Sequence, residues 1–302
     1  MSALAATFRA LRLHQWSKNA LVLVPIVLAP GIPKWTVVML GCLAALAFSL
    51  CASAGYVIND LLDLESDRAH PTKRNRPFAS RALPTWAGPP LVLSLVTLAA
   101  TLSLAFLPLK FIFMLGLYLV GTVVYSTLLK RTLLVDVLVL AGLYSHRVLA
   151  GGVATGVTVS AWLIGFSIFV FTSLAFAKRF VELRELASDA VVKNRGYLRL
   201  DLPLVGAMGT ASAFVSALVF VLYVESAAVR AGYLEPGVLW LALPILLYWL
   251  GRIWLLAGRG QLHDDPVRFA LKDKVSLLCG GVIAGLLLLA RFPPRILTAL
   301  IH

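Results

Sequence analysis

The amino-acid sequence predicts an all-α integral membrane protein, with nine spanning helices and one polar chamber at a single membrane face. Of the 302 residues, 60% are hydrophobic and only 14% are charged, whereas about a quarter of a soluble domain is charged. The apolar residues form long stretches, and the basic residues cluster between them. This composition excludes a disordered chain and a nucleic-acid-binding protein, because each needs far more charge.

A helix needs about 20 mostly apolar residues to span a bilayer, and the sequence predicts nine such helices. They cover residues 19–33, 36–58, 87–107, 110–129, 132–153, 159–177, 202–224, 236–257 and 275–292. The first is interrupted by Pro25, Pro30 and Pro33. The sequence predicts that residues 1–18, which precede this span, form an amphipathic lead-in helix. Because the spans fill the chain, we expect one membrane domain over 1–302.

The charges predict the orientation of these helices. Most of the 27 basic residues lie in segments that nine spans place on one face, including 59–81 and 178–201. The positive-inside rule makes this face cytoplasmic, which puts the N-terminus inside and the C-terminus outside a bacterial inner membrane. Most of the 14 acidic residues gather on the same face, although acids contribute little to topology. Acids and bases together predict a cytoplasmic chamber for a charged ligand.

The second apolar stretch leads directly into the run Asn59-Asp60-Leu61-Leu62-Asp63-Leu64-Glu65-Ser66-Asp67. If the helix continues, its period of about 3.6 residues places Asn59, Asp60, Asp63 and Asp67 on one face. Three carboxylates on one face repel one another unless a cation neutralises them. Mg²⁺ binds one or two carboxylates together with substrate phosphates. We therefore expect Asp60, Asp63 and Asp67 to hold Mg²⁺; a solvated helix end is the simpler alternative.

A basic loop follows at once, reading His70-Pro71-Thr72-Lys73-Arg74-Asn75-Arg76-Pro77. Its prolines disfavour a helix. Lys73, Arg74 and Arg76 place positive charge beside the aspartates, and such cations bind phosphate oxygens. Carboxylates for a metal and cations for phosphate together predict a metal–diphosphate site. Part of this charge also fits a purely topological role.

The N-D-x-x-D-x-x-x-D run and the H-P-T-K-R-N-R-P loop resemble the first motif of the UbiA superfamily of membrane prenyltransferases. The resemblance covers essentially the whole chain. It implies a nine-helix bundle that binds a Mg²⁺–diphosphate beside a lipid-accessible chamber. Aromatic prenyltransferases of the superfamily carry a second motif, D-x-x-x-D, after the sixth span. Here residues 177–184 read A-K-R-F-V-E-L-R instead, so this chain departs from their pattern.

Other stretches resemble the branch of the superfamily that transfers phosphoribosyl groups to polyprenyl phosphate. Residues 12–19, R-L-H-Q-W-S-K-N, resemble its R-x-x-Q-W-x-K-N start. Two further sets of residues resemble the same branch: Tyr125 with Lys130, and Lys178-Arg179 with Glu182. The resemblance implies 5-phosphoribosyl diphosphate as donor and polyprenyl phosphate as acceptor. It implies catalytic roles for Lys18 and Arg76 beside the aspartates. The residues expected to bind substrate are Gln15, Asn59, Lys73, Arg74, Tyr125, Lys130, Arg147, Lys178, Arg179 and Glu182.

Several of these residues also have structural interpretations. Trp16 fits an interfacial anchor, and Lys178 is spaced to pair with Glu182. Arg147 lies inside the fifth predicted span, where a charge is expensive and marks a functional site by default. It is expected either to pair with Asp136 or another acid, or to face the lipid phosphate. Asp265, just before Pro266, fits a helix N-cap.

Three functions remain open from the sequence. Phosphoribosyl transfer needs one metal-bearing motif and one basic motif, and the chain carries both. Aromatic prenyl transfer, for example to 4-hydroxybenzoate, predicts a second acidic pair. A transporter without chemistry would carry polar groups midway through the membrane. We favour the first; the expected partners are lipid substrates and membrane lipid, with no nucleic acid, and a homo-oligomer is compatible with these spans.

Overall fold

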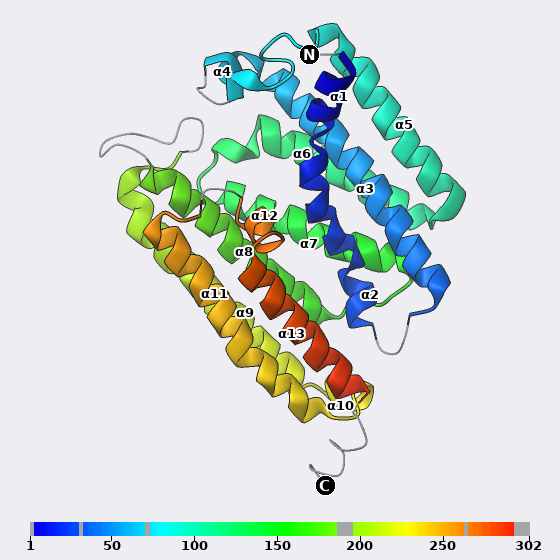
Figure 1. Cartoon of the computed structure of the whole chain (residues 1–302), viewed down its shortest axis with the longest axis vertical. Helices are drawn as coiled ribbons and strands as arrows, with labels where there is room; N and C mark the ends of the chain where they lie inside the picture. The colour runs from blue at the N-terminus through cyan, green and yellow to red at the C-terminus, as the bar shows by residue number, and fades with distance from the viewer. Residues whose placement is uncertain (1–2, 30–32, 70–72, 186–195, 263–264, 293–302) are drawn as a thin grey trace. The chain divides into compact units, whose positions relative to one another are not determined.

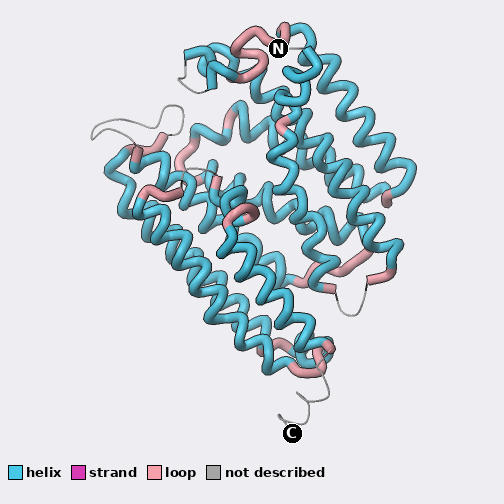
Figure 2. Tube along the Cα trace, viewed as in Figure 1, coloured by secondary structure: helices cyan, strands magenta, loops and turns pink. Residues whose placement is uncertain are grey.

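The computed structural model describes residues 3–29, 33–69, 73–185, 196–262 and 265–292, and every regular element in these ranges is helical (Figures 1 and 2). The all-α prediction is confirmed. The chain divides into two compact units. Unit 1 comprises Met1–Ile26, Lys34–Lys130 and His146–Val157, and unit 2 comprises Val27–Pro33, Arg131–Ser145 and Thr158–His302. The boundary falls within α7 (Val135–Thr155), which contributes to both.

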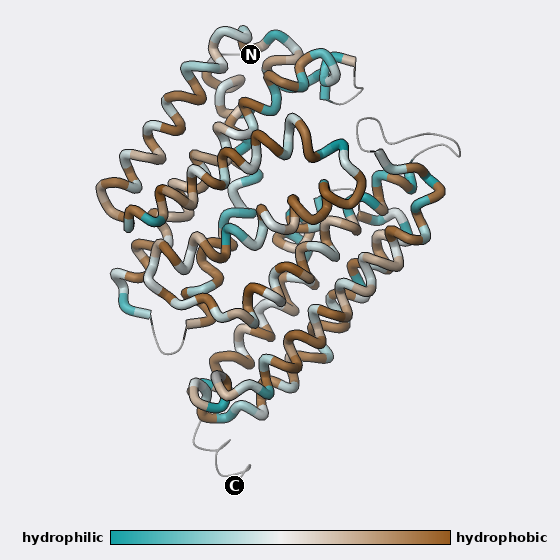
Figure 3. The backbone as a smooth tube through the Cα atoms, turned by 180° about the vertical axis from the view of Figure 1, so that it is seen from behind, coloured by the Kyte–Doolittle hydropathy of each residue, from teal (hydrophilic) through white to brown (hydrophobic). Residues whose placement is uncertain are grey.

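Eight helical segments of the described chain are long and apolar enough to cross a membrane. They are Trp35–Leu62, Thr85–Phe106, Leu109–Thr127, Val135–Thr155, Ala161–Arg184, Arg199–Val224, Pro236–Arg259 and Lys274–Arg291. Hydrophobic colours dominate these helices in Figure 3, and hydrophilic colours gather toward their ends. The eight segments correspond to eight of the nine predicted spans.

The predicted first span, 19–33, is not confirmed. Its described part forms the end of a 3₁₀ helix, η1 (Leu13–Leu23), and a five-residue helix, α2 (Val24–Leu28). Pro25 has no N–H to donate and fits only the first turn of an α-helix, so an α-helix begins afresh there. Lys18 and Asn19 are buried on η1, which packs against α3. The outside position of the C-terminus depends on nine crossings and stays a prediction.

Unit 1 is organised around one long helix, α3 (Trp35–Leu62), which packs against α1, η1, α5 and α6. The buried face of α3 is rich in small residues, which let neighbouring backbones approach closely. They are Ala44, Ala47, Ser49, Ala52, Ser53, Ala54 and Gly55. The other elements of unit 1 are α1 (Ala3–Leu11), α4 (Leu64–Ala69), η2 (Lys73–Asn75), η3 (Thr85–Ala87), α5 (Gly88–Phe106) and α6 (Leu109–Thr127).

The predicted lead-in helix is shorter than 1–18, because α1 ends at Leu11 and η1 begins at Leu13. Its apolar residues Ala6 and Ala10 pack on Val57 of α3 and on Phe78. Arg12, between the two helices, adopts the left-handed conformation with φ 50° and ψ 48°. That conformation is uncommon for a residue with a side chain, and it turns the chain sharply at this point.

Unit 2 is built on two paired helices, α8 (Ala161–Arg184) and α9 (Leu202–Val224), with α11 (Ala242–Arg259) packed against both. Trp254 of α11 fits against Gly209 of α9, where an added Cβ would overlap the indole ring. The Trp254 indole N–H donates to Ser173 Oγ of α8 at 2.9 Å. The remaining elements are η5 (Arg199–Asp201), α10 (Ala227–Gly232), η6 (Pro236–Leu241), α12 (Pro266–Ala270) and α13 (Lys274–Arg291), besides η4 (Leu129–Arg131) at the boundary.

Asp273 caps the N-terminus of α13 and binds α11 at the same time. One carboxylate oxygen accepts from the Ser276 backbone N–H at 2.8 Å and from Arg252 at 2.6 Å. Burial acts to raise the Asp273 pKa, but hydrogen bonds from Arg252 and Ser276 outweigh it and lower the pKa. The stabilisation is therefore present above the unfolded-state pKa of about 3.9. It is lost as pH falls through the lowered pKa.

We predict that Asp273→Ala lowers stability by about 1–2 kcal/mol, because both the N-cap and the ion pair disappear. Asp273→Asn keeps a capping oxygen but loses the charge, so its loss should be smaller. Thermal unfolding of the detergent-solubilised protein at neutral pH measures both. An alanine variant as stable as the unaltered protein would contradict the role of Asp273.

Candidate functional site

The aspartate run lies at the end of α3, where the helix continues about one turn beyond the predicted apolar stretch. Asp63 is its C-cap, with its N–H donating to Asn59 O at 3.0 Å, and α4 follows at once. The Asp67 N–H donates to Asp63 O at 2.8 Å. Asp60 and Asp67 are buried, at 2% and 3% exposure, whereas the Asp63 side chain is 28% exposed. The two buried carboxylates therefore need compensating charge.

Arginine supplies that charge. The Arg76 guanidinium donates to Asp60 Oδ1 at 3.2 Å and to Asp67 Oδ2 at 2.6 Å, so one side chain joins both carboxylates. Arg12 donates to the same Asp60 oxygen. Asp63 instead accepts from Lys130 Nζ at 2.7 and 2.9 Å. The structure thus brings Asp60 and Asp67 together on Arg76 and places Asp63 on a separate lysine.

The left-handed backbone of Arg12 directs its side chain to this cluster. The guanidinium carbon lies 5.1 Å from the centre of the Tyr56 ring, a cation–π distance. The neighbouring Arg9 donates to Asn75 O at 2.8 Å. These contacts attach the α1–η1 corner to both the end of α3 and the basic loop. Strained conformations that the surroundings hold in place cluster at functional sites.

A cavity of about 450 Å³ opens beside these residues within unit 1. Its lining residues are polar except for one proline: Arg9, Arg12, His14, Asp60, Asn75, Arg76 and Pro77. The cavity is therefore lined by three arginines beside Asp60, and their guanidinium groups suit an anionic ligand. The second Asp60 oxygen, Oδ2, is buried next to the cavity and has no partner among the described residues.

The donor set fits Mg²⁺ in part. Asp60 and Asp67 offer carboxylate oxygens, the ligand type that Mg²⁺ prefers. Within the described ranges, no group of three or more His, Cys, Asp or Glu side chains lies together as a metal site. Two carboxylates leave several positions of an octahedral ion to water and phosphate oxygens, which is the usual arrangement for Mg²⁺ with a phosphorylated substrate.

The other described basic residues of the loop are exposed. Lys73 and Arg74 are exposed on η2. Arg81 is exposed and has φ 61°. Residues 70–72 of the predicted loop, like 186–195 and Asp264 in the later polar segments, lie outside the described residues.

The motif at residues 12–19 packs against α3, with Lys18 and Asn19 buried and Leu13 and His14 exposed. The Trp16 indole N–H donates to Ser53 Oγ at 3.0 Å. Gln15 Oε1 is buried and accepts no hydrogen bond within the described residues. Lys18 is only 7% exposed. Tyr125, on α6, is half-buried. This segment therefore packs on the protein, and its first residues, Arg12 and His14, line the cavity.

Arg147 is 4% exposed and contacts neutral partners. Its Nε–H donates to Asn19 Oδ1 at 3.0 Å, and its terminal nitrogen donates to Tyr118 Oη at 2.9 Å. Asp136, its sequence-predicted structural partner, pairs with Arg179.

A second polar cluster lies in unit 2, where Arg179 is completely buried. Its Nε–H donates to Asp136 Oδ2 at 2.6 Å, and its terminal nitrogen donates to Glu182. The Tyr197 hydroxyl donates to Asp136 Oδ1 at 2.8 Å and accepts from the Leu134 N–H at 3.1 Å. Burial, followed by the hydrogen bond to Asp136 and its charge, raises the Tyr197 pKa, which keeps the hydroxyl a donor.

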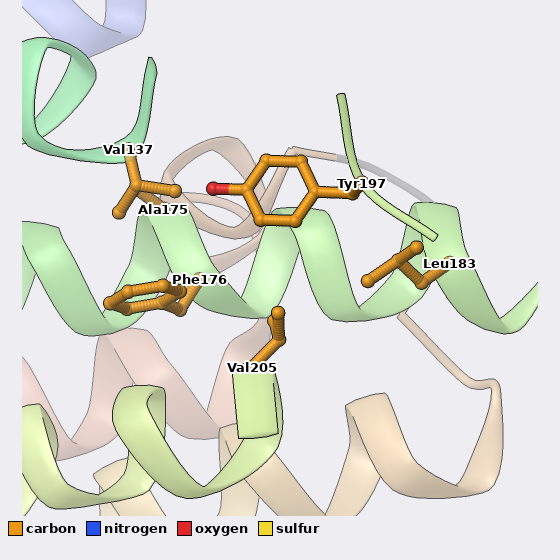
Figure 4. Close-up of a cluster of buried hydrophobic side chains, with 6 residues drawn as sticks. All are labelled: Val137, Ala175, Phe176, Leu183, Tyr197 and Val205. Atoms are coloured by element: carbon orange, nitrogen blue, oxygen red, sulfur yellow. The ribbon is translucent and has the colours of Figure 1, made fainter. Parts of the chain in front are cut away.

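Apolar side chains surround this cluster. Figure 4 shows the Tyr197 ring lying along α8, with its hydroxyl pointing toward Val137, a member of the apolar group. Lys178 faces other partners: its Nζ lies 3.4 Å from Asp265 Oδ2, and Tyr144 Oη lies 3.4 Å from Asp265 Oδ1. Asp265 also caps α12 through the N–H groups of Val267 and Arg268. The predicted N-cap is confirmed, and Glu182 pairs with Arg179 rather than with Lys178.

Sequence reasoning did not assign Arg9, Arg12 or His14 to the site. The signal available was position, because Arg12 and His14 fall inside the R-x-x-Q-W-x-K-N stretch. It also assigned Tyr197 no role, since an isolated tyrosine after a polar segment carries no distinguishing pattern.

Comparison with known proteins decides the family. The model of the UbiA prenyltransferase family matches residues 20–290. The chain belongs to the UbiA prenyltransferase family. With eight apolar helices long enough to span a bilayer, this UbiA-family member is an integral membrane protein.

Three relatives share most of this UbiA-family chain. It is 41% identical over 284 residues to the uncharacterized protein y4nM of Sinorhizobium fredii; the match covers 93% of this chain but spans only 55% of that relative's length. It is 32% identical to nodulation protein NoeC of Azorhizobium caulinodans, over 93% of this chain and 92% of that protein. It is 31% identical to decaprenyl-phosphate phosphoribosyltransferase of Mycobacterium tuberculosis, over 90% and 89%.

Solved structures share the fold at much lower identity. A UbiA homolog from Archaeoglobus fulgidus, bound to GPP and Mg²⁺, superposes with a TM-score of 0.71 at 15% identity, covering 93% of this chain and 99% of that one. A digeranylgeranylglyceryl phosphate synthase superposes with a TM-score of 0.65 at 16% identity, covering 96% and 97%. At such identities the likeness shows the fold alone.

We predict that Asp136→Ala destabilises the protein by about 3–5 kcal/mol, because it leaves the buried Arg179 charge without one of its carboxylates. Tyr197→Phe removes only hydrogen bonds of the hydroxyl, so its loss should be about 1 kcal/mol. The double variant Asp136→Ala/Arg179→Ala should be more stable than Asp136→Ala alone. Thermal unfolding in detergent ranks the three; a Tyr197→Phe loss as large as that of Asp136→Ala would contradict the charge argument.

Proposed function

We propose that the protein transfers a phosphoribosyl group from 5-phosphoribosyl diphosphate to a polyprenyl phosphate, with Mg²⁺ on the donor diphosphate. The observation that carries this proposal is the polar cavity beside Asp60. A ribosyl donor is polar throughout and carries a 5-phosphate in addition to its diphosphate. A cavity lined by Arg9, Arg12 and Arg76, with one proline as its apolar residue, suits such a donor better than an isoprenyl chain.

Two further observations support the same reaction. The Mycobacterium tuberculosis relative named decaprenyl-phosphate phosphoribosyltransferase matches over 90% of this chain. The D-x-x-x-D pattern of aromatic prenyltransferases is missing where α8 ends, and the arginine there is already paired with Asp136 and Glu182.

The donor diphosphate is assigned to the end of α3 and the basic loop. Asp60 and Asp67, with Asn59, would hold Mg²⁺, which supplies charge neutralisation at the leaving group. Asp63 would join them only by exchanging its contact with Lys130 for the ion, which would free Lys130 for a phosphate. Arg76 joins Asp60 and Asp67 and stands where negative charge develops as the diphosphate leaves. Lys73 and Arg74 are assigned to the same diphosphate from the exposed side of the loop.

The acceptor is assigned to the lysines of the same unit. Lys18 and Lys130, 7% and 8% exposed, would hold the lipid phosphate, with Gln15 and Tyr125 near them in sequence. For Lys178, Arg179, Glu182 and Arg147, substrate contact stays a sequence-based prediction.

The reaction breaks the bond between the ribose anomeric carbon and the diphosphate oxygen, and forms one from that carbon to an oxygen of the lipid phosphate. The anomeric carbon acquires oxocarbenium character, as in glycoside chemistry. Diphosphate leaves with the electron pair. The attacking phosphate oxygen is already anionic, so the reaction needs no general base. The proposed setting is the cytoplasmic face of a bacterial inner membrane.

We predict that purified protein with Mg²⁺, polyprenyl phosphate and ribose-labelled donor moves label into the organic phase. Chelation by EDTA or Asp60→Ala should abolish transfer, and Arg76→Ala should lower kcat/KM by roughly 10²–10³ through the lost leaving-group contact. Arg230→Ala is the matched control, because Arg230 is 68% exposed and pairs with Glu225 far along the chain.

Two results would contradict this proposal. Prenylation of 4-hydroxybenzoate from a polyprenyl diphosphate, without ribosyl transfer, would assign the same aspartates to aromatic prenyl transfer. Transfer that persists in Asp60→Ala at the unaltered rate would remove the cavity from the reaction.

A further inference from the structure

The buried arginine of unit 1, Arg147, is the centre of a network that joins four helices. Arg147, on α7, donates to Asn19 of η1 and to Tyr118 of α6. Its guanidinium carbon lies 4.9 Å from the centre of the Tyr118 ring and 5.6 Å from that of Phe48 on α3. Hydrogen bonds and cation–π contacts together hold this charge inside a helix of membrane-spanning length.

Asn19 connects this network to α3 by a hydrogen bond. Its amide oxygen accepts from Arg147, and its amide nitrogen donates to Ser49 Oγ at 3.0 Å. One turn earlier in the chain, Trp16 donates to Ser53 on the same face of α3. Both ends of the Asn19 amide are thus used to fix η1 between α7 and α3.

A glycine completes the contact between η1 and α7. A Cβ added at Gly151 would overlap the Val22 carbonyl oxygen and lie 2.8 Å from its carbonyl carbon. The backbones therefore touch, four residues along α7 from Arg147. At Gly142, earlier on the same helix, an added Cβ would meet no described atom within 4 Å.

The 3₁₀ form of η1 makes these contacts necessary. It runs for 11 residues, Leu13–Leu23, whereas 3₁₀ helices beyond about 3–4 residues are uncommon because their hydrogen bonds are poorer. Such a segment depends on outside contacts for its shape. Arg12, in the left-handed conformation, is its N-cap, and His14 lies in its first turn; both line the cavity beside Asp60.

We propose that Arg147 is a positioning residue: through Asn19 it fixes η1, and so places Arg12 and His14 at the anion cavity. This role differs from the lipid-phosphate contact expected from the sequence. The identity of the anion rests on the proposed function, whereas the placement of η1 does not. Breaking the network releases η1, and the cavity loses the wall formed by Arg12 and His14, while Asp60 on α3 and Arg76 of the basic loop remain in place.

The test measures η1 and the cavity separately. Hydrogen exchange of the backbone amides of residues 13–23 reports on η1, with α8 as the internal reference. Calorimetry with inorganic diphosphate and Mg²⁺ reports on the cavity. Arg147→Lys and Asn19→Ala should speed exchange in 13–23, leave α8 unchanged, and weaken diphosphate binding roughly tenfold, since each loses hydrogen bonds to a charged group.

Two matched pairs of variants separate positioning from a general loss of structure. Asn19→Asp keeps an acceptor for Arg147 but loses the donor to Ser49, so its exchange should be slower than that of Asn19→Ala. Gly151→Ala should act like Asn19→Ala, and Gly142→Ala should behave as the unaltered protein. In the transfer assay, Asn19→Ala should raise the donor KM roughly tenfold with kcat nearly kept, because the reacting groups on α3 stay in place.

Unchanged exchange of residues 13–23 in both Arg147→Lys and Asn19→Ala would overturn the inference, whatever the enzyme activity. Equal weakening of diphosphate binding in Gly142→Ala would do the same. Faster exchange with weaker diphosphate binding, in a protein that transfers no phosphoribosyl group, would support the positioning role and remove the proposed function.

Discussion

Two buried carboxylates, Asp60 at the end of α3 and Asp67 on α4, constrain how unit 1 packs. An unpaired buried charge is among the most expensive groups in a folded protein, and Asp60 and Asp67 are 2% and 3% exposed. Arg76 compensates both, which requires the basic loop to fold back onto α3. Arg12 binds the same oxygen of Asp60 as Arg76 does, which fixes the corner between α1 and η1. The electrostatic requirement of one helix end thus positions two segments that are distant in sequence.

The two units use buried arginine in different ways. In unit 2, Arg179 is fully buried and forms ion pairs with Asp136 and Glu182. In unit 1, Arg12 and Arg76 are about one-fifth exposed and line a cavity. A guanidinium that is partly open to a cavity can take up phosphate oxygens with its remaining donors. Ion pairing alone therefore does not mark a ligand site; an adjoining cavity is also needed.

The sequence predicted most of the fold because a bilayer imposes a length and an apolar composition that eight segments satisfy. The predicted span at 19–33 is not confirmed, since apolar composition does not distinguish a helix facing lipid from a segment packed on protein, such as η1 with Lys18 and Asn19 buried. Helical period grouped the aspartates, and the structure brings two of them together. The Arg12–Asp60 pair depends on a left-handed residue and a separation of 48 positions, which no local pattern encodes.

Family membership and fold leave the reaction to be argued from the cavity. Solved structures at 15–16% identity share the helical arrangement, and one fold commonly hosts several chemistries. Phosphoribosyl transfer and aromatic prenyl transfer both need carboxylates near a diphosphate, so Asp60 and Asp67 do not separate them. The two reactions differ in the part of the donor that is not diphosphate, and therefore in the side chains that should surround it. An isoprenyl chain gains affinity by leaving water for apolar walls, whereas a phosphorylated sugar gains it from charged and polar donors. The residues that line the cavity beside Asp60 carry guanidinium groups, an imidazole and an amide, with Pro77 as the one apolar residue type, so its charges favour the phosphorylated sugar.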